Sequence, residues 1–227
     1  MNLQPTTYKL PPQIKVCGLT KPDQIQELIS MNVDFLGFIF YEKSPRYVLN
    51  HLSLEEIYAI NHQGKVGVFV NEETDFILKI VQQAKLNLVQ LHGDESDDFI
   101  IELRQKLNPE VGIIKAIRVG NNDYDNKEKI AQTLSSNLQP VNYYLFDTDS
   151  KAFGGTGKQF DWNILNEIEI PLPYFLSGGI SEENIGNMEA LKQRPFALDI
   201  NSKFEKEPGN KNINKIKEFK ILYQQNR

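Results

Sequence analysis

Short apolar runs alternate along the chain with longer segments whose apolar residues recur at helical spacing. The runs lack the strict apolar–polar alternation of a half-exposed strand, which favours strands that are buried on both faces. We expect strands at residues 14–17, 35–40, 66–70, 88–91, 113–117, 143–146, 174–176 and 196–200. We expect helices at residues 22–31, 54–61, 75–84, 97–107, 127–134, 182–191 and 212–223, with a further short helix after Asp161.

The order of these elements predicts the fold class. Eight strand–helix pairs in chain order indicate an α/β fold, a single (β/α)8 TIM barrel, rather than a doubly wound sheet. No stretch rich in Pro, Gly or Ser divides the chain, so we expect one domain over residues 1–227, with residues 1–11 as an N-terminal extension. Residues 120–126 (GNNDYDN) are expected to form an exposed loop.

Composition narrows the classes of partner. The formal net charge is −5, and this mild acidity argues against nucleic acid and anionic membranes as partners. No segment approaches the about 20 consecutive apolar residues of a membrane helix, and the first residues lack the apolar stretch of a signal peptide. The single cysteine, Cys17, gives no internal disulfide. These features predict a cytoplasmic protein.

In a (β/α)8 barrel the residues that end the strands line one mouth, where the active site lies. Cys17 ends the first expected strand, in IKVCGLT, and is a candidate proton carrier or, alternatively, a small buried apolar residue. Asp147 ends the sixth strand, in YYLFDTDS, and is a candidate general acid. Asp199 ends the eighth, in FALDINS. For both aspartates the alternative is a loop cap that binds nearby backbone amides.

Two further candidates follow the second and fourth expected strands. Arg46, in YEKSPRYV, carries a planar guanidinium that suits a carboxylate or a phosphate, and a surface salt bridge is the alternative. His92, in VQLHGDES, is placed either to bond a substrate or to satisfy the backbone of its loop.

Two glycine clusters also follow strands. Gly178 and Gly179, in LSGGIS, allow backbone amides to approach a ligand after strand seven, where barrels often bind phosphate. Ser181 is the expected N-cap of the next helix. The second cluster is FGGTG, at residues 153–157. A plain tight turn is the alternative for either cluster.

Metal and cofactor chemistry are not indicated by any motif. The three histidines lack ligand spacing with cysteines or clustered acids, and neither a Walker-type loop nor a GxGxxG fingerprint follows a strand. We therefore expect neither a metal nor a cofactor.

Seven of these segments together resemble the successive motifs of the phosphoribosylanthranilate isomerase family. The segments occur in the order of the family, from about residue 13 to the last expected helix, so the resemblance covers nearly the whole chain. They are IKVCGLTKPDQI, GFIFYEKSPRYV, VGVFVNE, VQLHGDES, FDTDSKAFGGTGKQFDW, YFLSGGISEENI and ALDINSKFE.

The resemblance implies an Amadori rearrangement of N-(5-phosphoribosyl)anthranilate in tryptophan biosynthesis, without a cofactor, by a monomer or homodimer. By analogy Asp147 is the general acid that opens the sugar ring, and the Cys17 thiolate is the base that removes the C2 proton. Arg46 matches the arginine that holds the anthranilate carboxylate. His92 and Asp199 are the other substrate-binding positions. The positions that match the phosphate-binding residues are Gly178, Gly179, Asn201 and Ser202.

The chain departs from the family pattern after the eighth strand. Where the family has Ser-Gly-Val-Glu, this chain has Ser202, Lys203, Phe204 and Glu205. Lys203 replaces a glycine, so it carries strain if that position needs a positive φ, or else its ammonium reaches the phosphate. The later PG-x-K-D pattern reads PGNKN at residues 208–212.

Two alternatives of different kinds remain. The first is a related barrel isomerase that acts on an aminoaldose of histidine biosynthesis, although such enzymes use two aspartates where this chain has Cys17 and Asp147. The second is a binding or regulatory protein that kept the barrel and lost turnover, because a fold alone does not establish a function.

Overall fold

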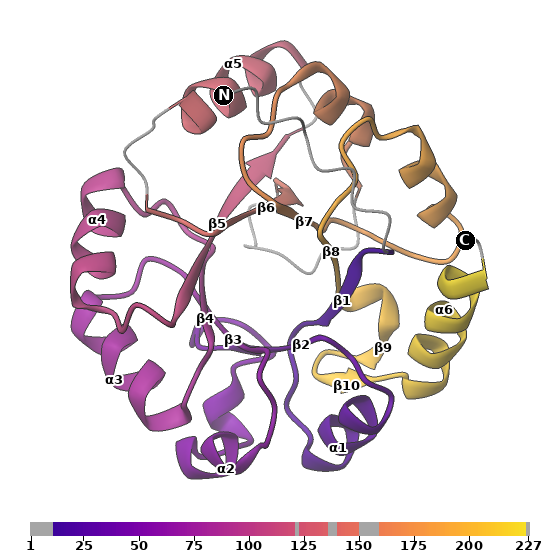
Figure 1. Cartoon of the computed structure of the whole chain (residues 1–227). Coiled ribbons are helices and arrows are strands. Elements are labelled where there is room, and N and C mark those ends of the chain that lie inside the picture. Colours follow the sequence, from indigo (N-terminus) through magenta and orange to yellow (C-terminus); the bar gives the residue numbers. More distant parts are fainter. Residues whose placement is uncertain (1–10, 121–122, 136–139, 150–158, 226–227) are drawn as a thin grey trace.

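The computed structural model describes residues 11–120, 123–135, 140–149 and 159–225. Eight parallel strands form a closed barrel whose order around the ring is the order along the chain, from β1 to β8 (Figure 1). Helices surround the ring, as Figure 1 shows. The closure is made by β1 and β8, which pair over four residues. The predicted TIM barrel is therefore confirmed.

The elements lie close to the expected ranges. The barrel strands are β1 Gln13–Val16, β2 Phe35–Ile39, β3 Lys65–Phe69, β4 Leu88–Leu91, β5 Gly112–Val119, β6 Tyr143–Thr148, β7 Tyr174–Leu176 and β8 Ala197–Ile200. The α-helices are α1 Pro22–Ser30, α2 Leu54–Ala59, α3 Thr74–Ala84, α4 Asp97–Lys106, α5 Asp123–Ser135 and α6 Ile213–Gln225. Shorter 3-10 turns are η1 Val48–Asn50, η2 Trp162–Glu167, η3 Ile185–Ala190 and η4 Ser202–Phe204.

Two local expectations are wrong. The expected loop at residues 120–126 ends earlier, because α5 begins at Asp123, and the acidic and amide residues of that segment favour a helix start. The expected helix at 182–191 is the 3-10 turn η3, with Asn184 rather than Ser181 at its N-cap. The short helix expected after Asp161 is present as the 3-10 helix η2. The FGGTG cluster lies outside the described residues.

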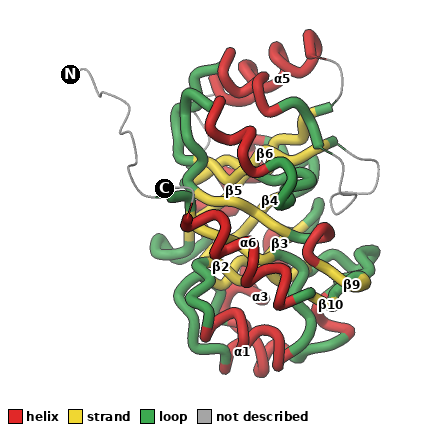
Figure 2. Tube along the Cα trace, turned by 90° about the vertical axis from the view of Figure 1, so that its right-hand side faces the viewer, coloured by secondary structure: helices red, strands yellow, loops and turns green. Residues whose placement is uncertain are grey.

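One hairpin was not expected from the sequence. β9 Glu205–Glu207 and β10 Asn210–Lys211 pair antiparallel after β8. Figure 2 shows this hairpin at one end of the molecule, beyond the barrel strands. The side chain of Gln24, in α1, donates to the backbone oxygen of Lys211 at 3.0 Å and accepts from its backbone nitrogen at 2.8 Å. The hairpin is thus fixed against the first helix of the chain.

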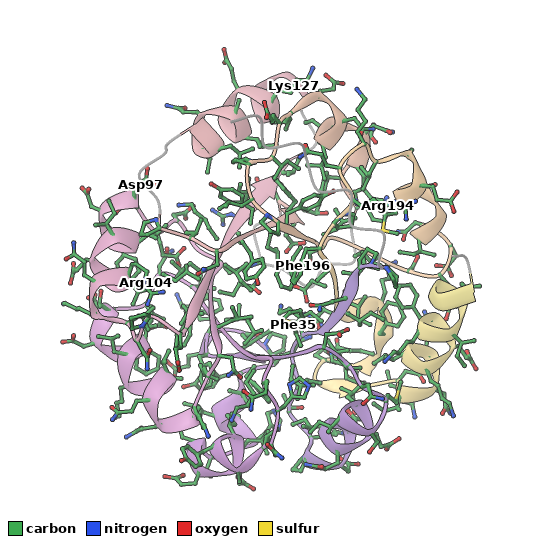
Figure 3. The ribbon with its side chains drawn as sticks, in the orientation of Figure 1. Phe35, Asp97, Arg104, Lys127, Arg194 and Phe196 are labelled. Atoms are coloured by element: carbon green, nitrogen blue, oxygen red, sulfur yellow. The ribbon has the colours of Figure 1, made fainter. Side chains whose placement is uncertain are left out.

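Side chains that point into the barrel differ in character along its axis. Four aromatic rings, those of Phe35, Tyr143, Phe175 and Phe196, pack together with centroid distances of 5.0 to 6.2 Å. Figure 3 labels Phe35 and Phe196, which lie inside the ring of strands. The alternate residues of the strands pack outward against the helices, in a second and larger apolar cluster. Both faces of each strand are therefore buried, which is why the sequence shows apolar runs without strict alternation.

Candidate active site

Polar side chains from four separate strands or strand ends meet above the aromatic rings. Cys17 follows β1, His92 follows β4, Asp147 lies in β6 and Asp199 in β8, and each is at most 7% exposed. Asp199 interacts electrostatically with both Cys17 and Asp147. The structure therefore brings together the four candidate groups that the sequence placed at strand ends. Their separations in space could not be read from the sequence.

His92 and Asp147 form a contact across the barrel interior. Nε2 of His92 lies 3.3 Å from Oδ2 of Asp147, although β5 separates their two strands in the ring. Nδ1 of His92 lies 2.9 Å from Nε2 of Gln90, in β4. In this arrangement Nδ1 accepts from the Gln90 amide, so the imidazole presents an Nε2 proton to the carboxylate. The other oxygen of Asp147 accepts from the backbone N–H of Thr148 at 2.8 Å. One oxygen of Asp147 thus makes the loop contact expected from the sequence, and the other faces the Nε2 proton of His92.

Cys17 lies beside a fully buried ion pair. Nζ of Lys15, in β1, lies 2.9 Å from Oδ2 of Asp199, and the positive charge of Lys15 also acts on the thiol of Cys17. Burial raises the pKa of the Cys17 thiol, while the positive charges of Lys15 and Lys211 oppose that rise. Burial likewise raises the pKa of Asp199, and Lys15 again acts in the opposite direction. The thiol and the carboxylate thus depend on the same ammonium group for stabilisation of their charged forms.

Arg46 is buried rather than part of a surface salt bridge. Nε and Nη2 of its guanidinium bind the carboxylate of Glu205, at 3.0 and 2.6 Å. Oε1 of Glu205 also accepts from Nζ of Lys211 at 2.6 Å, and Lys211 donates to Oδ1 of Asn201 at 2.8 Å. A Cβ on Gly18 would lie 2.6 Å from Cδ of Arg46, so the glycine beside Cys17 leaves room for the arginine stem. Glu205 holds one edge of the guanidinium, and Nη1 lies outside this pair.

The two glycines after β7 adopt conformations that favour glycine. Gly178 has a φ of 84° and Gly179 a φ of 72°. A Cβ on Gly178 would lie 2.4 Å from Oγ1 of Thr148, so the β7 loop approaches the end of β6 closely. The side chain of Asn184 closes this loop, because it donates to the oxygen of Gly179 and accepts from the nitrogen of Ser181, both at 2.8 Å. The glycine pair is therefore a braced turn beside Asp147.

The remaining phosphate-binding candidates follow β8. Asn201 precedes the 3-10 turn η4, which opens with Ser202. Lys203 is exposed and is not among the residues with positive φ in the described part of the chain, so the strain considered for this position does not arise. Its backbone oxygen accepts from Nζ of Lys215 at 3.0 Å.

Several residues of this site were missed at the level of sequence. Lys15 and Gln90 each stand two positions before a candidate residue, on the same face of the same strand, and this period of two was the available signal. Lys211 and Glu205 were visible only as positions of the family pattern. Glu205 pairs with Lys211 within the hairpin and with Arg46 outside it, and no local pattern indicates either ion pair.

The described residues were compared with two further kinds of feature, metal-binding groups and membrane-spanning helices. Within residues 11–120, 123–135, 140–149 and 159–225, no group of three or more His, Cys, Asp or Glu side chains is arranged to hold a metal ion. Over the same ranges, none of the helices has the length and apolar character needed to cross a membrane.

A thiol and a histidine-paired carboxylate, enclosed at the carboxyl ends of barrel strands, form the candidate active site of a (β/α)8-barrel enzyme. Comparison with known proteins specifies the family. The model of the N-(5'-phosphoribosyl)anthranilate (PRA) isomerase family matches residues 14–220. The chain belongs to the N-(5'-phosphoribosyl)anthranilate isomerase family, and the family resemblance seen in the sequence is confirmed.

Individual relatives support this assignment over nearly full length. The N-(5'-phosphoribosyl)anthranilate isomerase of Parabacteroides distasonis is 38% identical over 210 residues, which cover 91% of this chain and 90% of the relative. That of Rippkaea orientalis is 36% identical, with 94% and 96% covered. The crystal structure of the Thermotoga maritima enzyme has a TM-score of 0.77 and 33% identity, with 94% and 99% covered. Another structure of phosphoribosyl anthranilate isomerase holds reduced 1-(o-carboxyphenylamino)-1-deoxyribulose 5-phosphate, with a TM-score of 0.73, 31% identity and the same coverage.

Proposed function

We propose that this chain converts N-(5'-phosphoribosyl)anthranilate into 1-(2-carboxyphenylamino)-1-deoxyribulose 5-phosphate, the Amadori rearrangement of tryptophan biosynthesis. The observation that carries the proposal is the meeting of Cys17 and the His92–Asp147 pair around Asp199 at one end of the barrel. The family match over residues 14–220 supports it, as does the reduced product bound to a related enzyme.

Two proton transfers make up the chemistry. Asp147, in its protonated form, gives a proton to the furanose ring oxygen as the C1–O bond breaks, and the nitrogen lone pair forms the C1–N double bond of a Schiff base. The thiolate of Cys17 then takes the proton from C2, and the C–H electron pair moves towards the iminium nitrogen to give an enolamine. Tautomerisation of the enolamine to the ketone completes the reaction. Because the iminium is an electron sink, a thiolate of moderate basicity suffices.

The contacts of Asp147 fix the orientation of the proposed acid. His92 faces one of its oxygens and the Thr148 amide the other, so the carboxyl group is fixed in direction. Its side chain lies in an enclosed site of low exposure, where charged groups interact more strongly than in water. A fixed, desolvated acid loses little reorganisation energy when it transfers its proton.

The binding roles follow the positions of the remaining candidates. Arg46 binds the anthranilate carboxylate through the part of its guanidinium that Glu205 does not hold. Asp199, whose Oδ1 is buried without a hydrogen-bond partner among the described residues, accepts from a substrate hydroxyl, and His92 contacts the sugar. The phosphate lies against the backbone of Gly178 and Gly179 and the polar groups at residues 201–202.

The proposal also covers the cofactors, the cellular location and the oligomeric state of the enzyme. The reaction needs neither metal nor cofactor, because both proton carriers belong to the chain. We place the enzyme in the cytoplasm, where a biosynthetic enzyme with a free thiol at its site stays reduced. It acts as a monomer or as a homodimer. The Thermotoga maritima relative is described as dimeric.

The test is an assay of freshly prepared phosphoribosylanthranilate, in which the loss of its fluorescence is followed after addition of the purified protein without metal. We expect a rapid loss with the wild type. We expect Cys17→Ala and Asp147→Asn each to reduce turnover by about 10²-fold or more, since each removes one proton carrier. Lys217→Ala, at an exposed position of α6, is the control.

Three outcomes overturn parts of the proposal. Wild-type turnover in either variant, with the fold intact by circular dichroism, removes that residue from its role. No turnover by the wild type rejects the substrate, and the histidine-pathway aminoaldose is then assayed in the same way. Binding of the reduced product without turnover of substrate identifies a barrel that binds but does not catalyse.

A further inference from the structure

The side chain of Lys15 occupies a place where a lysine is costly. It points into the barrel from β1, is 0% exposed, and lies beneath the site, two residues before Cys17. A buried ammonium needs charged or hydrogen-bonding partners, because an unpaired charge inside a protein costs several kcal/mol. An apolar residue at this position, as in the aromatic layer below, would have avoided that cost.

Lys15 lies beside two groups that can carry negative charge, the carboxylate of Asp199 and the thiolate of Cys17. Its Nζ lies 2.9 Å from Oδ2 of Asp199, and its charge interacts with Cys17, which stands two residues further along the extended chain and on the same side of it. Although burial acts to lower the pKa of Lys15, the charges of Asp199 and Cys17 outweigh it and raise that pKa above its ordinary value. The ammonium is therefore held protonated between a carboxylate and a sulfur atom.

Among the described groups that affect the titration of Cys17, the other elements supply one more cation and no further acid. From β10, Lys211 acts on the thiol as a positive charge, but Glu205 also binds it. From the loop after β2, Arg46 passes beside Gly18 and is likewise bound by Glu205. From β2 itself, Gly37 contributes only space, since a Cβ there would lie 3.0 Å from Sγ of Cys17. Lys15 is thus the cation that lies two positions from Cys17 on the same side of the chain, and its ion pair is with Asp199 rather than with Glu205.

We propose that Lys15 is the positioning residue that stabilises the thiolate of Cys17, and that Asp199 opposes it by sharing the same ammonium. The inference rests on the proposed function, in which Cys17 is the base. Lys15 touches no reacting atom and acts through the sulfur. It keeps its own proton throughout. When Cys17 takes the proton from C2, the negative charge leaves the sulfur and the neutral Lys15–Asp199 pair remains.

This arrangement gives opposite signs for the two partners. Loss of the Lys15 charge removes a stabilising positive charge from beside the thiolate and exposes the thiolate to the uncompensated carboxylate of Asp199, so the pKa of Cys17 rises. Loss of the Asp199 charge removes a repulsion and leaves the ammonium wholly to the sulfur, so the pKa falls. A residue with a merely structural role would alter stability without this pair of opposed shifts.

The experiment is a titration of Cys17 by the ultraviolet absorbance of its thiolate. Cys17 is the only cysteine of the chain, so the signal has one source, and Cys17→Ser supplies the baseline. In Lys15→Met we expect the midpoint to rise by about one pH unit or more, which means about tenfold less thiolate at a given pH below it. In Asp199→Asn we expect it to fall. Lys217→Met is the surface control.

Kinetics give a second readout on the same variants. In Lys15→Met we expect kcat to fall with little change in KM, and its pH profile to shift upward together with the thiol midpoint. An unchanged midpoint in a folded Lys15→Met protein, or shifts of equal sign in the two variants, overturns the proposal.

If Lys15→Met does not fold, the double variant Lys15→Met/Asp199→Asn removes both charges and is compared with Asp199→Asn alone. A higher midpoint in the double variant supports the role of Lys15, and equal midpoints reject it. The titration needs no substrate, so an inactive wild type would reject the proposed function separately from this inference.

Discussion

At the scale of single residues, Glu205 connects more of the site than any motif suggested. Its carboxylate accepts from Nε and Nη2 of Arg46 and from Nζ of Lys211, and its Oε1 also accepts from the backbone of Gly209 at 3.1 Å. Two cations therefore depend on one acid for their position. Burial acts to raise the pKa of Glu205, but Arg46 and Lys211 outweigh it and leave that pKa below its ordinary value.

We predict that Glu205→Gln lowers the free energy of unfolding at neutral pH by about 3 kcal/mol, because it leaves buried cations without a counter-ion. A carboxyl with a lowered pKa in the folded state stabilises the fold above its unfolded pKa, and this contribution disappears as the pH falls through the folded-state value. The wild type should therefore lose stability as the pH falls below 4.5, its ordinary pKa, and the variant should lose less. Urea unfolding at several pH values measures both effects. Glu218→Gln, at an exposed position of α6, is the control, and an equal effect there would contradict the argument.

A second prediction at this scale concerns the turn beside the proposed acid. Gly178→Ala places a methyl group 2.4 Å from Oγ1 of Thr148 and forces alanine into a positive φ of 84°. We expect kcat/KM to fall by about tenfold or more, because the shift displaces both Asp147 and the turn proposed to bind the phosphate. The cost in stability is about 1–3 kcal/mol. Gly186→Ala is the matched control, since a Cβ there meets nothing within 4 Å. Comparable losses in the two variants would show that the effect is not local.

At the scale of elements, Lys65 joins two helices to the barrel. It begins β3, is 1% exposed, and its Nζ donates to the backbone oxygens of Ile57, at the end of α2, and Ala84, at the end of α3, at 2.9 and 3.0 Å. The last carbonyl groups of a helix lack partners within the helix and carry partial negative charge. One ammonium group therefore satisfies the carboxyl ends of two helices.

We predict that Lys65→Met destabilises the protein by about 3 kcal/mol while its kinetic constants stay within about twofold, since buried carbonyls lose their donor far from the site. Chemical denaturation and steady-state kinetics on the same preparation separate the two effects. Lys79→Met, exposed on α3, serves as the comparison. A loss of kcat in Lys65→Met at full stability would mean that this lysine has another role.

The elements also show how far the sequence predicts the fold. The barrel strands were placed within a few residues, because strands buried on both faces produce apolar runs that few other structures share. The β9–β10 hairpin was missed, since the residues of β9 are Glu, Lys and Glu and its position depends on Gln24 in α1. The sequence predicts a longer helix where η3 is a short 3-10 helix, because apolar spacing does not distinguish an α-helical turn from a 3-10 turn.

At the scale of the whole molecule, part of the candidate site could be predicted from the sequence and part could not. Strand ends are local features, so Cys17, Asp147 and Asp199 were visible in the sequence as candidates. The partnership of Lys15 with Asp199 was not, since 184 positions separate the two residues and only closure of the ring brings them together. The roles given to these residues stay predictions until the variants are measured.

That closure has a consequence for the protein during its synthesis. The first four strands, β1 to β4, bring Cys17 and His92, and β6 and β8 bring their partners Asp147 and Asp199. When only the first half of the chain has been synthesised, Cys17 therefore lacks the Lys15–Asp199 ion pair beside it, and His92 lacks the carboxylate of Asp147. The candidate site is complete only when the last barrel strand pairs with the first, so we expect activity to appear only once the ring has closed.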